Sequence, residues 1–350
     1  INSIIQRKKL NLSSNNLLMQ KISDKLLINL LLPIVLLTMV FYGFNSAYFP
    51  YSTLEKLPDY YYSNVYNFRF ISRDALVWFF EQFNAVFSSL NPTLKEYASQ
   101  YGTPFYHSFF LFNAFFLVFT SWCLSEIFAL KTFAKTSEVV KIIIHTLILL
   151  LISITSYVLT PYDSPALFLF AITVFFTLKY FEERKPKQLI FISALIFIST
   201  LNRETSSLNI AFLGALFLNK EILKKEKLQK FIRIIALPVL AFLLAYISVR
   251  IFMKTDEATV SEGIYLVQNL TKPNNILGIL FFIIFIRLTQ KISSSQQNIS
   301  KISAFLLLCS PYLLMILMVG ILWEIRLFIP IIFGMILLSQ MNFEEDTKMD

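Results

Sequence analysis

Four short segments of this chain together hold a set of carboxylates and arginines, and each segment lies between or beside long apolar runs. The segments are 59–74, 160–165, 202–207 and 323–326. Their charged side chains and one neighbouring tyrosine are Asp59, Arg69, Arg73, Asp74, Tyr162, Asp163, Arg203, Glu204, Glu324 and Arg326. Arginine binds phosphate oxygens through two N–H groups at once, and a carboxylate beside it could act as a general base on a hydroxyl. The combination predicts a site for a phosphate-bearing substrate.

The rest of the composition indicates what must hold these residues. Of the 350 residues, 56% are hydrophobic and only 15% are charged, and the mean hydropathy is +0.63. A soluble domain has about 25% charged residues, so this chain has too few polar side chains to cover a water-soluble domain of its size. Cys123 and Cys309 both lie in apolar runs and are expected to be buried free thiols. The composition therefore predicts an integral membrane protein.

Ten apolar runs are candidates for membrane-crossing helices, because about 20 mostly apolar residues cross ~30 Å of hydrocarbon as a helix. The runs are 25–44, 108–130, 140–160, 164–181, 188–202, 206–218, 231–253, 275–290, 302–323 and 326–340. The alternation of apolar and polar residues that is typical of a membrane β-barrel is absent from the sequence. We therefore expect an all-α integral membrane protein, a polytopic bundle of about ten transmembrane helices that forms one transmembrane domain over 1–350.

The distribution of lysine and arginine orients this bundle, because these residues are retained on the cytoplasmic side. With both termini inside, 22 of the 31 lysines and arginines lie in cytoplasmic segments and 9 lie outside. Residues 1–24 are then a cytoplasmic interfacial segment, and 45–107 is a long extracytoplasmic loop. Within this loop, 72–90 has apolar residues at helical spacing, which predicts a helix along the membrane interface. The net charge of +9 is explained by topology and contact with membrane lipid, so no nucleic-acid partner is expected.

On this topology all four charged segments face outward, at or near the membrane surface. Residues 202–207 form the apex of a hairpin whose arms are about 15 and 13 residues long, so at ~1.5 Å per residue Arg203 should lie close to the hydrocarbon. An arginine at this depth is a candidate functional residue. Structural roles stay open for each segment. They are an aromatic belt that anchors the long loop, an N-cap formed by Asp163 or Ser164, an Arg203–Glu204 pair that pins the hairpin, and an interfacial Glu324–Arg326 ion pair.

Short stretches of the sequence are similar to those of uncharacterised bacterial polytopic proteins associated with surface-polysaccharide synthesis. They are Tyr66-Asn67-Phe68-Arg69, Tyr162-Asp163-Ser164, Leu201-Asn202-Arg203-Glu204-Thr205 and Glu324-Ile325-Arg326-Leu327-Phe328. The layout of a short cytoplasmic N-terminus, one span and a long acidic outer loop also resembles the C-type (GT-C) integral-membrane glycosyltransferases. The resemblance implies transfer of a sugar from a polyprenyl-phosphate-linked donor to a glycan, lipid or protein acceptor. It places the reaction at the extracytoplasmic face of a bacterial inner (plasma) membrane.

The resemblance also implies a catalytic carboxylate in the first outer loop, where Asp59 matches best in position and Asp74 second. With Asp163, these are the candidate catalytic residues. The candidate substrate-binding residues are Arg69, Arg73, Tyr162, Arg203, Glu204, Glu324 and Arg326. No motif requires a cofactor, although Asp59 and Asp74 could hold a divalent metal ion. Three alternatives stay open: a polysaccharide polymerase or ligase with a pyrophosphate-linked donor, a lipid or solute transporter, and a purely structural membrane subunit.

Overall fold

The structure is a computed structural model, and it describes residues 23–44, 50–156, 160–218, 225–253 and 264–343. Throughout these ranges the protein is helical and contains no strand, which confirms the predicted all-α fold. Residues 1–22 of the predicted cytoplasmic segment and residues 45–49 of the predicted outer loop lie outside the described ranges.

The N-terminal half contains one helix with two π-helical turns, several short helices and four longer ones. Its elements are η1 (Leu27–Leu31), α2 (Leu32–Thr38), η2 (Met39–Gly43), η3 (Asp59–Tyr62), α4 (Asn64–Asn67), α5 (Phe70–Ser88), α6 (Pro92–Ser99), α7 (Pro104–Phe128), η4 (Lys131–Phe133), α8 (Glu138–Thr155) and α9 (Asp163–Glu183). The starts of α6, α7 and α8 follow from the sequence, because Asn91, Thr103 and Ser137 accept backbone hydrogen bonds as N-caps. Proline follows the cap in α6 and α7, where its missing N–H is not needed.

The C-terminal half contains shorter apolar helices beside two long ones. Its elements are α10 (Pro186–Asn202), η5 (Glu204–Ser206), α11 (Ser207–Phe217), α12 (Lys225–Phe252), α13 (Leu266–Thr271), α14 (Pro273–Lys291), α15 (Gln296–Leu308), α16 (Ser310–Val319), η6 (Ile325–Leu327) and α17 (Ile329–Gln340). The predicted run 302–323 is broken where α15 meets α16, and the two helices are bent by 49°. Pro311 lies in the first turn of α16, where it favours the start of a new helix.

Six of the described helices are long and apolar enough to cross a membrane, or seven if the bent pair of α15 and α16 counts as one span. The six are Ser23–Gly43, α7, α8, α9, α12 and α14. Two further apolar helices, α10 and α17, are too short to be counted in the same way. Each of the ten predicted runs therefore contains helix, but ten crossings are not confirmed. The long apolar helices are compatible with an integral membrane protein.

The short helix α17 shows why an apolar run need not face lipid. All of its residues from Ile329 to Ser339 are buried in the protein. They pack in the main hydrophobic core, for example Phe333 against Phe170 of α9. A helix that is apolar on every side belongs in such a core. In contrast, most of the apolar residues of α12 and of Ser23–Gly43 are exposed or only partly buried at the surface of the bundle.

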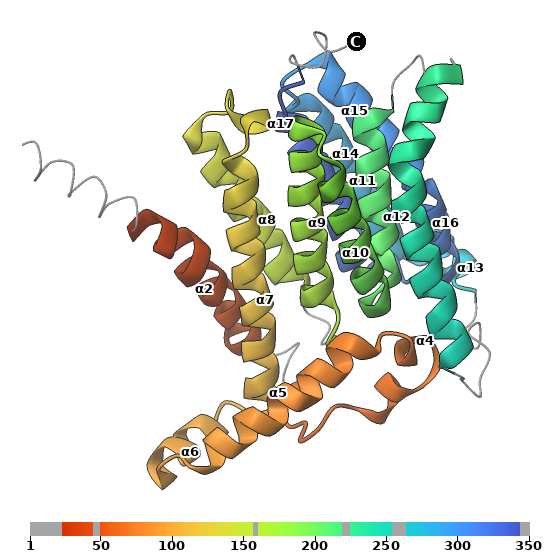
Figure 1. Ribbon diagram of the computed structural model, residues 1–350. Helices are drawn as coiled ribbons and strands as arrows, with labels where there is room; N and C mark the ends of the chain where they lie inside the picture. Colours follow the sequence, from red (N-terminus) through yellow and green to blue (C-terminus); the bar gives the residue numbers. More distant parts are fainter. Residues whose placement is uncertain (1–22, 45–49, 157–159, 219–224, 254–263, 344–350) are drawn as a thin grey trace, which may run out of the picture.

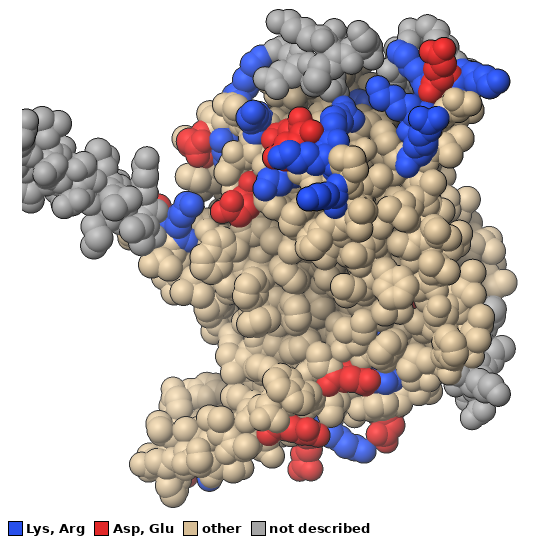
Figure 2. All heavy atoms as spheres, in the orientation of Figure 1, with Lys and Arg blue, Asp and Glu red and all other residues tan. Residues whose placement is uncertain are grey.

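Charged residues collect at the two ends of the bundle. Helix α5 lies across one end, below the first turns of α7 and α9 and the last turn of α10 in Figure 1; we call this the α5 end. The predicted helix over 72–90 is thus confirmed as α5. Figure 2 shows a broad uncharged belt between the α5 end and the opposite end, where lysines and arginines gather. This distribution is expected of a protein whose middle contacts hydrocarbon and whose ends contact water.

Candidate functional site

Three charged residues from distant parts of the sequence meet at the α5 end. Asp163 is the first residue of α9, Arg203 follows the last residue of α10, and Arg326 lies in η6, just before α17. One carboxylate oxygen of Asp163 accepts a hydrogen bond from Nη1 of Arg203, and the other oxygen accepts one from Nη1 of Arg326. The side chains of Arg203, Asp163 and Arg326 are only 9%, 17% and 13% exposed. Asp163 therefore bridges two arginines in a largely dehydrated place.

The backbone around Asp163 leaves its carboxylate free for this role. Tyr162 is the N-cap of α9, and the helix has no side-chain N-cap hydrogen bond. The Ser164 hydroxyl instead donates to Oδ1 of Asn113 at 2.6 Å. The alternative in which Asp163 or Ser164 caps the helix is therefore not what the structure contains. Arg203 has an extended backbone (φ −163°, ψ 142°) that ends α10 and turns its side chain out of the helical path.

Arg326 is held by a second carboxylate as well. Its Nε and Nη2 atoms both donate to Oε2 of Glu324, at 3.1 Å and 2.7 Å. The predicted Glu324–Arg326 ion pair therefore exists, but as part of a larger network that includes Asp163. The irregular turn before α17 makes this pairing possible, because residues two apart on a regular helix point in different directions.

Glu204 forms a similar bridge next to the first one. Nε and Nη2 of Arg69 both lie 3.1 Å from Oε2 of Glu204, and Nη2 of Arg250 lies 3.7 Å from its Oε1. Burial raises the pKa of Glu204, but the charges of Arg69, Arg250 and Arg203 outweigh burial and hold this pKa below its ordinary value. Glu204 is therefore ionised at neutral pH. Its partners are arginines of other segments and not the adjacent Arg203, so the predicted Arg203–Glu204 pair is not formed.

Tyr162 joins the two bridges. The guanidinium carbons of Arg69 and Arg203 lie 4.7 Å and 5.4 Å from the centre of its ring, within the range of cation–π attraction. Tyr66 stacks on the same ring at 6.2 Å with an interplanar angle of 20°. The two bridges and the Glu324 contact together contain four arginines and three carboxylates, so the network has one more positive charge than negative charges.

Three residues of this network were missing from the prediction. Asn202 is fully buried, its Nδ2 donates to the backbone oxygen of Tyr162 at 3.2 Å, and its Oδ1 accepts from Ser72 of α5. Arg250 lies in the last turn of α12, and its guanidinium carbon is 3.4 Å from the centre of the Tyr246 ring. The Tyr312 hydroxyl donates to the backbone oxygen of Leu327, the residue next to Arg326, at 3.0 Å. Only Asn202 stood beside a predicted residue in the sequence.

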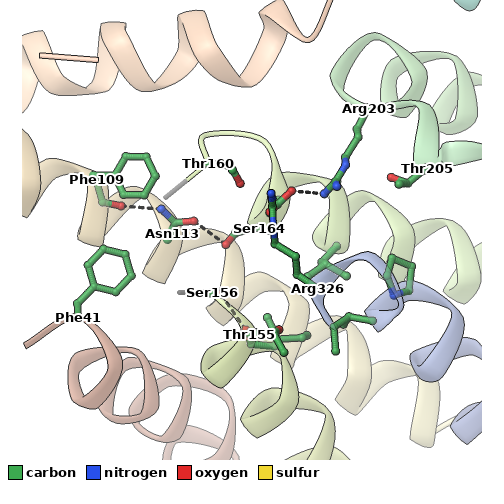
Figure 3. A pocket seen from close by; sticks show the side chains of 16 residues that line it. Phe41, Phe109, Asn113, Thr155, Ser156, Thr160, Ser164, Arg203, Thr205 and Arg326 are labelled. Carbon is green, nitrogen blue, oxygen red and sulfur yellow. Dashed lines mark hydrogen bonds and ion pairs between the residues drawn. The ribbon is translucent and has the colours of Figure 1, made fainter. Parts of the chain in front are cut away.

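A cavity of about 500 Å³, counting the open space at its mouth, lies against Asp163, Arg203 and Arg326. Its other polar lining residues are Asn113, Thr155, Ser156, Thr160, Ser164 and Thr205, and the apolar part is formed by Phe41, Phe109, Ile152, Ala166, Leu167, Ile329 and Pro330. Figure 3 shows Arg203 and Arg326 entering from separate elements, with Asn113 and Ser164 between them and the rings of Phe41 and Phe109. The cavity therefore combines anion-binding groups with an apolar wall.

No protein-family model, curated protein or solved structure matches this chain. The residues themselves must therefore indicate what the site binds. Within the described residues, no group of three or more His, Cys, Asp or Glu side chains is placed so that it could hold a metal ion. The charged groups that line the cavity are the two arginines Arg203 and Arg326 and the single carboxylate of Asp163, so the lining has a net positive charge, which suits an anionic ligand.

The remaining predicted residues lie outside the cavity. Asp59 is 85% exposed and pairs with Lys56 at 3.0 Å. Arg73 is buried, but it donates to Asp74 at 2.7 Å and to Asn67 at 2.9 Å, and it lies over the ring of Tyr62. Asp74 itself is 56% exposed. Of the three predicted catalytic carboxylates, the structure therefore brings only Asp163 to the arginines that line the cavity. The catalytic roles of Asp59 and Asp74 stay predictions.

Proposed function

We propose that this protein is a membrane-embedded glycosyltransferase that takes a sugar from a polyprenyl-phosphate-linked donor. The observation that carries the proposal is the cavity at the α5 end, where Asp163, Arg203 and Arg326 meet beside an apolar wall. A lipid-linked phosphate needs both features, because its charge requires guanidinium donors and its isoprenoid chain requires an apolar neighbourhood.

The membrane placement is part of the same proposal. The ten apolar runs cross or enter the bilayer with both termini in the cytoplasm, and the α5 end faces the extracytoplasmic side of a bacterial plasma membrane. The basic residues at the opposite end support this orientation, since lysine and arginine are retained inside (Figure 2). Helix α5 then lies along the outer interface, with the exposed Trp78 among its residues.

In the proposed reaction the arginines bind the donor phosphate and the acceptor hydroxyl approaches the anomeric carbon. The hydroxyl oxygen forms the new bond to this carbon while the bond from the carbon to the phosphate oxygen breaks. The phosphate leaves with the electron pair, and Arg203 and Arg326 stabilise its growing charge. The acceptor proton passes to a carboxylate, for which Asp163 is the candidate within the cavity and Asp59 and Asp74 are the candidates implied by the resemblance.

The aromatic surroundings suit the sugar. A second hollow of about 290 Å³, counting its mouth, shares Phe109 with the cavity and is lined by Tyr60, Tyr61 and Tyr106 among others. Tyr61 lies 6.3 Å from Tyr162, ring centre to ring centre. Aromatic faces of this kind offer stacking surfaces to a sugar ring close to the proposed phosphate site.

A second candidate function rests on the second arginine pair. Arg69 and Arg250 hold Glu204 as Arg203 and Arg326 hold Asp163, with Tyr162 between the two pairs. Two adjacent arginine pairs would suit two phosphate groups. This favours a polysaccharide polymerase or ligase with a pyrophosphate-linked donor as the alternative.

The test is a transfer assay with purified protein in lipid nanodiscs. A labelled monosaccharide polyprenyl phosphate and a pyrophosphate-linked oligosaccharide are supplied separately, each with a mixture of glycan and lipid acceptors. Arg203→Ala should lower transfer by about 100-fold or more, because one charged donor to the leaving group is lost. The exposed Arg287 of α14 provides the matched control, and Arg287→Ala should keep full activity.

The outcomes separate the proposals. Turnover of the pyrophosphate-linked donor alone rejects the transferase in favour of the polymerase or ligase. Movement of labelled lipid across vesicles without a covalent product would indicate a transporter. If Arg203→Ala keeps more than about a tenth of the activity, the assigned site is wrong. Comparison of Asp59→Asn with Asp163→Asn then identifies which carboxylate is the base, since only the loss of the base should abolish turnover with donor binding intact.

A further inference from the structure

We infer that Asp163 occupies the position of a ligand phosphate between Arg203 and Arg326, and that a phosphate monoester replaces it when the ligand binds. The inference rests on the proposed function for the origin of the phosphate, but it concerns binding and needs no transfer. It makes the Asp163 bridge an internal substitute for the ligand and not a permanent clamp.

The first argument is the shape of the bridge. Each oxygen of the Asp163 carboxylate is used by one arginine, and the two arginines come from different elements. A phosphate monoester has three terminal oxygens and a charge of about −1.5 to −2 at neutral pH, against −1 for a carboxylate. It can therefore take over both contacts and bind the two guanidinium groups more strongly.

The second argument is a donor that the carboxylate leaves unused. Arg203 is only 8% exposed, and its Nε is buried. This N–H group nevertheless has no hydrogen-bond partner among the described residues. Buried N–H groups are nearly always hydrogen-bonded, and an unmatched one calls for an explanation. Both oxygens of Asp163 are already engaged, so a third acceptor oxygen is missing at this place. The third terminal oxygen of a phosphate would supply it.

The third argument is that both partners can adapt to the exchange. Arg326 keeps the two hydrogen bonds from Nε and Nη2 to Glu324 when Asp163 leaves. The released carboxylate stays in the same cavity, whose wall offers the hydroxyl of Thr160. In the proposed transfer this monoester is the released polyprenyl phosphate, because the sugar-linked donor is a phosphodiester with only two unbridged oxygens.

The experiment measures binding of inorganic phosphate to the purified full-length protein, by calorimetry and by thermal stabilisation at constant ionic strength. Asp163→Asn removes the internal competitor, so half-saturation should occur at a concentration at least tenfold lower than for the wild type. Glu324→Gln is the matched control. It also removes one negative charge from Arg326 but leaves Asp163 on both arginines, so its half-saturating concentration should stay within about threefold of the wild type. The double change Asp163→Asn with Arg203→Gln should abolish the gain.

Equal gains in Asp163→Asn and Glu324→Gln would overturn the inference, because a general change in charge would then explain both. No gain in Asp163→Asn would overturn it as well. If Asp163→Asn folds only in phosphate and not in chloride of the same ionic strength, the exchange is supported; failure to fold in both counts against it. Repeating the titration in nanodiscs that contain polyprenyl phosphate distinguishes a lipid source from free phosphate. A protein that passes these tests but transfers no sugar would reject the proposed function alone.

Discussion

Gly278 allows a sharp test of how the charged turn before α17 is positioned. A Cβ atom added at Gly278 would lie 2.0 Å from the backbone oxygen of Leu322, 2.8 Å from its carbonyl carbon and 3.2 Å from Cα of Trp323. This stretch is also held on the same side by two hydrogen bonds. The N–H groups of Leu322 and Trp323 donate to Oδ1 of Asn269 and Asn275, each at 3.3 Å.

Gly278→Ala should therefore displace the turn that presents Glu324 and Arg326. Real Cβ atoms stay beyond 3.0 Å from such neighbours, so the Leu322 backbone must move by about 1 Å. Overpacking of this kind costs about 1–3 kcal/mol, and a backbone contact belongs at the upper end. Alanine gains about 1 kcal/mol over glycine within a helix, which leaves a net loss of about 2 kcal/mol. At about 2 °C per kcal/mol, the unfolding midpoint should fall by about 4 °C.

The assay compares thermal unfolding, phosphate binding and sugar transfer with those of Gly43→Ala. No atom lies within 4 Å of a Cβ added at Gly43, so this control makes the same chemical change in open space. Gly43→Ala should be neutral or slightly stabilising, whereas Gly278→Ala should also weaken transfer by about 100-fold, since a shift of about 1 Å in a positioning group has such an effect. If the two variants unfold and bind phosphate alike, the close approach of α14 to the turn is refuted.

Two further predictions concern the supports of the site. Asn202→Ala leaves the Tyr162 backbone oxygen and the Ser72 hydroxyl without their buried partner, so it should destabilise the protein by about 1–3 kcal/mol in thermal unfolding. The comparison variant is Asn91→Ala, which removes an exposed N-cap and should cost about 1 kcal/mol. The pKa of Glu204 is lower in the folded protein than its ordinary value. Ionised Glu204 therefore stabilises the fold fully above the unfolded-state pKa of about 4.3, and this contribution is lost as the pH falls from there through the folded-state pKa. The difference in stability between wild type and Glu204→Gln should hence be constant from pH 8 to 5.5 and shrink below pH 4; a difference that grows with acidity would contradict the assigned ionisation.

The helices could be predicted because the backbone N–H and C=O groups of a long apolar run have no water to bind. They must form hydrogen bonds within the run, and a helix satisfies them all. The number of crossings could not be predicted with the same security. The runs that form α10 and α17 are apolar for different reasons, since α17 is buried in protein on every side while half of the apolar residues of α10 remain accessible. Hydropathy measures the preference for an apolar environment, and both protein and lipid provide one.

The site was predictable to the extent that it depends on which end of a helix a residue occupies. Asp163, Arg203 and Arg326 all lie at helix ends, and alternating helix directions bring these ends to the same side of the bundle. The position around that end depends on packing, which spacing does not reveal. Asp59 therefore shares the end with Asp163 but points to solvent. Arg250 lies at the end of a long apolar helix, where sequence alone offers no reason to choose it.

The composition of the network favours a role in binding an anion over a purely structural role. Burying two charges is costly, and a buried ion pair is often no more stable than well-packed apolar residues of the same volume. If Asp163, Arg203 and Arg326 served only to fasten α9, α10 and α17, apolar side chains would do so without an unmatched N–H on Arg203. The network instead has an excess of positive charge, an unused donor and a cavity beside it. Each of these costs stability in the absence of an anion, and all three become favourable when an anion binds.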